Sequence, residues 1–180
     1  MKAAAALALS MLFLTSLLPA ERVTRPPAGS TLPQIAVYVD VTGLTREAQE
    51  QALNAGRQFL RRNVNSQRMA AVYVFDGKTT SLVQDFTADL TQLNHAIDHE
   101  ISIMKGVDRV PDPARTAAFL NAVQMARAMK GPKEMAFYVR IPLTMDSRQA
   151  DSLTDLAVKH EMKFSPIDES GRVHALSFGN

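Results

Sequence analysis

The sequence predicts one α/β domain with an open, mostly parallel central sheet, an antiparallel edge hairpin strand and helices on both faces. Two observations lead to this prediction. Short apolar runs of strand length have no polar side, which is typical of strands covered on both faces. After a first strand–turn–strand unit, such runs alternate with helical patterns. The clearest run is Ile35 to Val39, and it ends at Asp40.

The first 34 residues differ in character from the rest of the chain. Residues 1–20 have a positive charge near their start at Lys2, continue as an almost wholly apolar stretch and end at Ala20, which is the pattern of a signal peptide. An uncleaved membrane anchor is the alternative, because about twenty apolar residues span a bilayer. Residues 21–34 are rich in proline and have no hydrophobic period, so we expect a linker. The domain should then occupy residues 35–180 of a periplasmic or secreted protein, without inserting into the membrane.

A helical pattern follows the first strand from Leu44 onward. Small and apolar residues recur there at steps of three and four, with charged residues between them, which predicts a helix that packs on a sheet. Met69 to Phe75 predicts a second buried strand. Asp76-Gly77 predicts a turn, and Ser81 to Phe86 a shorter and more polar strand. We therefore expect a hairpin at one edge of the sheet.

The second half of the chain alternates helices and strands. Thr87 is the expected N-cap of the next helix, and Asp146 or Ser147 that of the last one. The remaining predicted segments are a helix with a buried stripe from Leu90 to Ile101, a loop from Lys105 to Ala114, a helix lined by apolar residues from Phe119 to Met129, and strands at Met135–Ile141, Met162–Ile167 and Val173–Phe178.

Composition narrows the classes of function. The formal net charge of +2 is too small to indicate nucleic-acid binding. The chain has no cysteine, so disulfides and a lipidated cysteine are excluded. His95 and His99 lie four residues apart, but we expect both on the solvated face of their helix. We find no acid–base or nucleophile pair at a supporting spacing, so no catalytic activity is expected.

Two segments together resemble a von Willebrand factor type A (VWA) domain, and in particular its exported bacterial members. They are IAVYVDVTGLT with the helix EAQEQALNAGRQFLRRNV, and RMAAVYVFDGKTTSLVQDFTADLTQLNHAI. The resemblance extends from Ile35 to Phe178. It implies a Rossmann-like three-layer sandwich and a role in binding another protein, in adhesion or assembly. It also implies a divalent cation, usually Mg²⁺, above the sheet.

The family's metal-ion-dependent adhesion site has the pattern Asp-x-Ser-x-Ser, a later Thr and a later Asp. Asp40 matches the first position, Thr42 the second with its hydroxyl kept, and Thr116 the later threonine. Hard oxygen ligands of this kind suit Mg²⁺. Leu44 stands in the third position, where it cannot ligate, and Arg115 replaces the glycine that usually precedes the threonine. The resemblance thus implies an incomplete site. Without metal, the aspartate would accept hydrogen bonds from the following turn, and the threonines would cap helices.

A second set of residues is expected to meet a partner at the same edge. Arg109 and Arg115 flank Pro111-Asp112-Pro113, and Asp146 follows the central strand. In an ordered loop, either arginine would bind a carboxylate of a partner protein without metal. Asp146 would replace the family's later aspartate only if its loop shifts by one residue. We therefore predict Arg109, Asp112, Arg115 and Asp146 as partner-binding residues.

Three functions stay open at this point. The first is an exported protein-binding module with an incomplete metal site. The second is a metal-free structural subunit of a cell-envelope assembly, in which the crevice is vacant. The third is an α/β enzyme that uses the same crevice, and the absence of a phosphate-binding glycine-rich loop after the first strand counts against it.

Overall fold

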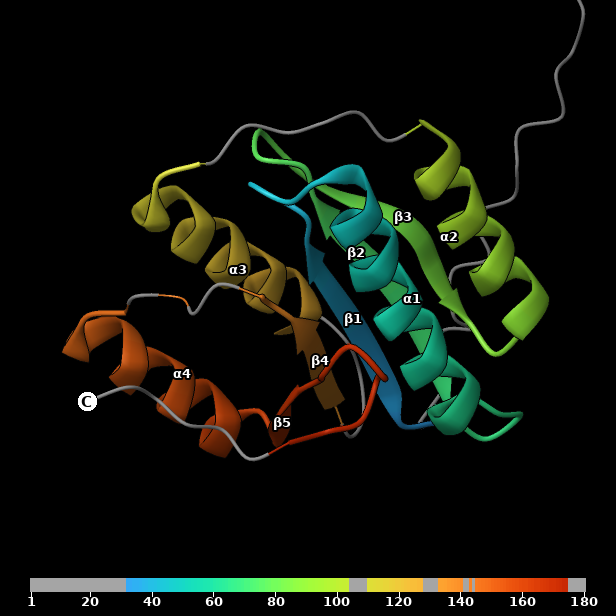
Figure 1. Ribbon diagram of the computed structural model, residues 1–180. Helices are drawn as coiled ribbons and strands as arrows, with labels where there is room; N and C mark the ends of the chain where they lie inside the picture. Colours follow the sequence, from blue (N-terminus) through green and yellow to red (C-terminus); the bar gives the residue numbers. More distant parts are fainter. Residues whose placement is uncertain (1–31, 104–109, 128–132, 141–142, 144, 175–180) are drawn as a thin grey trace, which may run out of the picture.

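One mixed sheet of five strands organises the chain (Figure 1). The computed structural model describes residues 32–103, 110–127, 133–140, 143 and 145–174. The expected signal segment at 1–20 and nearly all of the expected linker at 21–34 lie outside these residues. Within the described ranges, no helix is both long and apolar enough to cross a membrane.

The sheet has the predicted arrangement, with four parallel strands and one antiparallel edge strand. Its order is β3-β2-β1-β4-β5, and only the pairing of β2 with β3 is antiparallel. The bounds are β1 Gln34–Asp40, β2 Met69–Phe75, β3 Thr80–Thr87, β4 Lys133–Tyr138 and β5 Met162–Pro166.

The three central strands are in level register. Gln34 at the start of β1 lies opposite Met69 in β2 and Lys133 in β4. At the other end, Asp40 lies opposite Phe75. The carboxyl ends of the parallel strands therefore meet at one edge of the sheet.

Two helices cover each face of this sheet, as the sequence predicts (Figure 1). Helices α1 (Arg46–Asn63) and α2 (Leu90–Ile103) pack on one face. Helices α3 (Asp112–Arg127) and α4 (Ser147–Lys159) pack on the other. The result is a three-layer sandwich.

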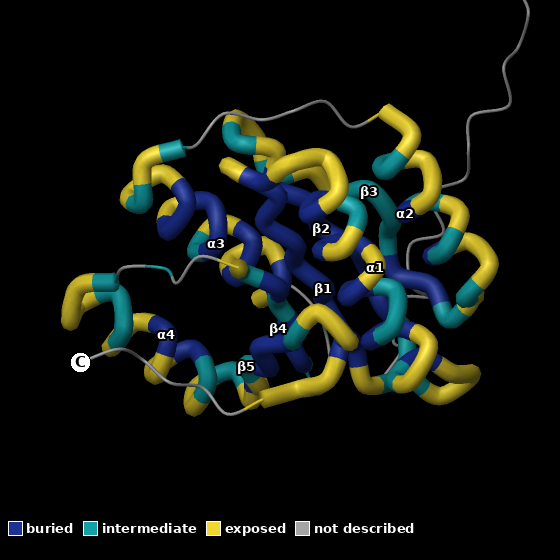
Figure 2. Tube along the Cα trace, in the orientation of Figure 1, coloured by how far each residue is buried: buried dark blue, intermediate teal, exposed yellow. Residues whose placement is uncertain are grey.

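Strand β1 lies at the centre of the core, and every one of its residues is buried (Figure 2). Ile35, Val37 and Val39 belong to the cluster beneath α1 and α2. Ala36 and Tyr38 belong to the cluster beneath α3 and α4. Successive side chains of a strand point to opposite faces, so Asp40 extends the α3 side of this alternation.

Capping side chains set the starts of α1 and α2. Thr45 Oγ1 accepts a hydrogen bond from the backbone N–H three residues later at 3.3 Å, so α1 begins at Arg46 and Leu44 lies just before it. The prediction that Thr87 caps α2 is wrong. Asp89 Oδ1 accepts two backbone N–H groups of the first turn, at 2.7 and 3.3 Å, while Thr87 Oγ1 accepts from the N–H of Asp89. Threonine and aspartate both cap helices well, and here Asp89, which directly precedes Leu90, is the N-cap.

Several boundaries differ from the prediction. Helix α3 begins at Asp112, so the predicted loop through Ala114 is too long at its carboxyl end; Pro113 is tolerated because the first turn of a helix has N–H groups without intrahelical partners. Strand β4 ends at Tyr138, before the predicted Ile141. Of the predicted last strand, Val173 forms an isolated antiparallel bridge with Ile167, and residues 175–178 lie outside the described residues.

A buried acid joins the amino ends of the strands. Glu134 of β4 accepts a hydrogen bond from Ser165 Oγ at 2.6 Å, and it forms ion pairs with Arg68 and, at 3.3 Å, with Lys163. Burial by itself raises the pKa of Glu134, but the hydrogen bond and the two cations outweigh it and lower the pKa below its ordinary value. This cluster stabilises the end of the sheet opposite Asp40.

Candidate functional site

The candidate site lies where the chain changes direction across the sheet. From β1 the chain continues to β2 on one side, and β4 lies on the other side of β1. In open α/β sheets, ligands bind outside the carboxyl ends of strands at such a switch point. Asp40 is the last residue of β1 and lies there.

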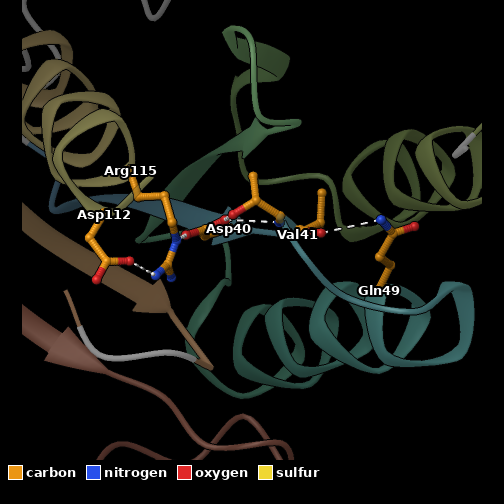
Figure 3. A network of polar contacts seen from close by, with 6 residues as sticks. Asp40, Val41, Gln49, Asp112 and Arg115 are labelled. Atoms are coloured by element: carbon orange, nitrogen blue, oxygen red, sulfur yellow. Dashed lines mark hydrogen bonds and ion pairs between the residues drawn. The ribbon is translucent and has the colours of Figure 1, made fainter. Parts of the chain in front are cut away.

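Both carboxylate oxygens of Asp40 have partners within the protein (Figure 3). Oδ1 accepts hydrogen bonds from the backbone N–H of Thr42 at 3.0 Å and from its hydroxyl at 2.7 Å. Oδ2 accepts from Nε of Arg115 at 2.8 Å. The side chains of Asp40 and Arg115 are only 1% and 3% exposed. The two residues thus form a buried, hydrogen-bonded ion pair between β1 and α3.

Arg115 also has a second acidic neighbour. Its Nη1 lies 3.5 Å from Oδ1 of Asp112, three residues earlier on the same face of α3. The side chain of Asp112 is 37% exposed, and the residue lies at the start of α3, where the helix dipole favours a negative charge. A line of alternating charge therefore runs from buried Asp40 through Arg115 to Asp112 near the surface.

Gln49 holds the turn that follows Asp40. It is fully buried on α1, and its Nε2 donates to the carbonyl of Val41 at 3.2 Å (Figure 3). In the described part of the chain, its Oε1 is buried and has no hydrogen-bond partner. We did not predict Gln49 as a site residue. The sequence feature that could have indicated it is that Gln49 is polar but lies next to Ala48 on the apolar side of the helix.

Tyr38 lies beneath the ion pair in β1. Its ring makes an edge contact with Phe119 of α3, with 5.5 Å between ring centroids. Burial raises the pKa of Tyr38 well above its ordinary value; the charge of Asp40 adds to this rise and that of Arg115 opposes it. Its hydroxyl is buried without a hydrogen-bond partner among the described residues. A phenol in this state is a poor proton donor, so Tyr38 is suited to packing.

The residues present do not fit a divalent cation at Asp40. The hydroxyl of Thr42 donates to Asp40, and a fixed guanidinium occupies the other carboxylate oxygen. Thr116 is buried within α3, beyond its start. Leu44, in the third position of the motif, is part of the apolar core. A search of the described ranges finds no group of three histidine, aspartate or glutamate side chains that would hold a metal.

The predicted partner-binding residues are in three different situations. Arg115 is buried, so the expectation that it meets a partner's carboxylate is wrong: its guanidinium is turned inward to Asp40. Arg109 lies outside the described residues. Asp146 is exposed and caps α4, forming a capping box in which it exchanges hydrogen bonds of 2.8 and 3.0 Å with Gln149. Of the members of this set that the structure describes, Asp112 and Arg115 are joined to the Asp40 site and Asp146 is not.

Comparison with known proteins supports the fold. No protein-family model and no curated protein matches the sequence. Among solved structures, the chain is similar to the VWA domain of SpRpn10, with a TM-score of 0.55 and 12% identity over 75% of this chain and 74% of that one.

Two bacterial structures are similar to a lesser degree. They are BatB from Bacteroides thetaiotaomicron and an aerotolerance-related membrane protein from Bacteroides fragilis, each with a TM-score of 0.51 and 11% identity over 74% of this chain. The chain spans 64% and 65% of their lengths. At such identities the likeness concerns the fold. Together with the strand order and the two helical layers, it shows that this chain has the fold of a von Willebrand factor type A domain.

Proposed function

We propose that this chain is an exported protein-binding or assembly module of the bacterial cell envelope, and that it does not act as an enzyme. The main support is that the polar groups at the carboxyl end of β1 are engaged with one another. Asp40, Thr42 and Arg115 are bonded to one another and buried. A general base or nucleophile must reach its substrate, and these groups instead stabilise the site from within.

The proposed location rests on two observations. Residues 1–20 have the pattern of an export signal. Two proteins of similar fold are BatB and an aerotolerance-related membrane protein, both from Bacteroides species. A domain of this fold tethered to, or released from, a bacterial membrane is the arrangement that fits both.

We place the partner surface over the carboxyl ends of β1 and β4. Asp112 presents a half-exposed carboxylate there, at the start of α3. The charge of Arg115 beneath it is shared with Asp40. A partner would therefore meet an acidic group whose orientation is fixed by a buried arginine.

Site-specific crosslinking tests this proposal. A photoreactive amino acid replaces Asp112 in one variant and Gln67 in a control; Gln67 is exposed in the turn between α1 and β2, and so lies at the opposite end of the sheet. We expect irradiation of cells to yield a discrete crosslinked protein from position 112 and none from position 67. A product from position 67 alone would contradict the proposed surface and favour the structural subunit with a vacant crevice.

A further inference from the structure

We infer that the guanidinium of Arg115 takes the place of the divalent cation at this site, as a built-in and permanent positive charge. The site is then closed to metal and keeps its shape without it. This inference concerns Asp40 and its neighbours alone, so it does not depend on the partner proposed above.

The carboxylate of Asp40 is already engaged in hydrogen bonds within the protein. Asp40 accepts three hydrogen bonds, two from Thr42 and one from Arg115. Mg²⁺ binds oxygen ligands at about 2.0–2.1 Å and demands near-octahedral geometry. Three of the about four acceptor positions of the carboxylate are thus occupied, and an ion would have to reach the remaining one, beside Arg115, on a side chain that is 1% exposed.

A divalent ion at this carboxylate would meet a positive charge that is already present. The Nε of Arg115 lies 2.8 Å from Oδ2 of Asp40, and the side chain of Arg115 is 3% exposed. An arginine stays protonated at every pH at which proteins are folded. A dication bound to the same carboxylate would therefore lie beside a fixed positive charge, with little water between them to screen the repulsion.

Arg115 is held in place by its helix and by Asp112. Arg115 belongs to α3, which is fixed to the sheet by Phe119, Ala122 and Val123 in the core. Asp112 holds Nη1 from the side away from Asp40, at 3.5 Å. The guanidinium is thus held between Asp40 and Asp112, on a helix that is itself packed on the sheet.

Metal binding to the unchanged site is the first test. The full chain is purified in mild detergent, since residues 1–20 are apolar, and titrated with Mn²⁺ while water-proton relaxation is followed. We expect the wild type and Asp40→Asn to give the same weak titration. A wild-type dissociation constant below one millimolar that is lost in Asp40→Asn would overturn the inference.

Removal of the guanidinium is the second test. In Arg115→Ala, Mg²⁺ or Mn²⁺ at millimolar concentration should raise the unfolding temperature, because a ligand that binds only the folded state stabilises it. The rise should vanish in Asp40→Asn/Arg115→Ala, and the control Arg61→Ala, which removes an exposed arginine of α1, should show none. Arg115→Gln keeps more of the side-chain volume and replaces the alanine variant if that variant does not fold. Absence of an Asp40-dependent rise in the folded variant would overturn the inference.

Discussion

Removing Arg115 while leaving Asp40 in place should be one of the most damaging single changes in this domain. In Arg115→Met the apolar stem is largely kept, but the carboxylate of Asp40 loses its charged partner while it remains 1% exposed. Breaking a buried ion pair from one side costs about 3–5 kcal/mol, because an uncompensated charge is left in the interior. For a chain of this size, each kcal/mol lowers the unfolding temperature by about 2–4 °C, so the expected decrease is roughly 6–20 °C.

The double variant Asp40→Asn/Arg115→Met separates two costs, the loss of the ion-pair attraction and the burial of an unpaired carboxylate. Without charge on either side, the pair resembles an ordinary polar and apolar contact, and replacing whole buried pairs is often nearly neutral. We therefore expect the double variant to be more stable than Arg115→Met alone. Urea unfolding of the wild type, Asp40→Asn, Arg115→Met and the double variant, followed by circular dichroism, gives the four free energies that a double-mutant cycle needs. A cost below about 1 kcal/mol for Arg115→Met, the value of a solvated surface pair, or strictly additive costs would refute the buried pair as described.

Further predictions concern other parts of the fold. The pKa of Glu134 is lowered, so its contribution to stability is present above its ordinary pKa of 4.5 and is lost as the pH falls below that value. Between about pH 5 and pH 3, the free energy of unfolding should therefore decrease more steeply in the wild type than in Glu134→Gln. Thr45→Ala removes the cap of α1 and should cost about 1 kcal/mol in urea unfolding. Gly171→Ala should cost more than the about 1–2 kcal/mol of a left-handed residue, because its φ is +68° and an added Cβ would lie 2.4 Å from the carbonyl oxygen of Ala55. The exposed Gly43, with φ of 64°, is the control, and its alanine variant should show the backbone cost alone.

The sequence was a good guide to the layers of this fold because local patterns carry them. The apolar run of β1 predicts a strand covered on both faces, and all of its residues are buried. The stripe of small residues along α1 predicts a helix that packs on a sheet, and it does so. Asp76-Gly77 predicts the turn of the edge hairpin, where Gly77 has a φ of 93°. Each signal lies within one element and needs no knowledge of distant residues.

The candidate site was only partly predictable because its central contact joins residues 75 positions apart. Asp40 was identified from its place after β1. Arginines are rarely buried, so the sequence predicts that Arg115 faces a partner. The residues around Arg115 in the sequence do not indicate that the carboxylate of Asp40 lies next to α3 in the fold. Thr42 keeps a hydroxyl that suits a metal or an aspartate equally, and only the structure shows it bonded to Asp40. The contact between Asp40 and Arg115, which the local motif does not predict, therefore determines the structure of the site.

We propose that the carboxyl ends of β1 and β4 form a protein-binding surface kept in shape by Asp40 and Arg115 without a cation. Its most direct test is the crosslink from position 112 in isolated cell envelopes, with and without EDTA. We expect a discrete product whose yield is unchanged in EDTA. A product that is lost in EDTA and restored by Mg²⁺ would contradict it.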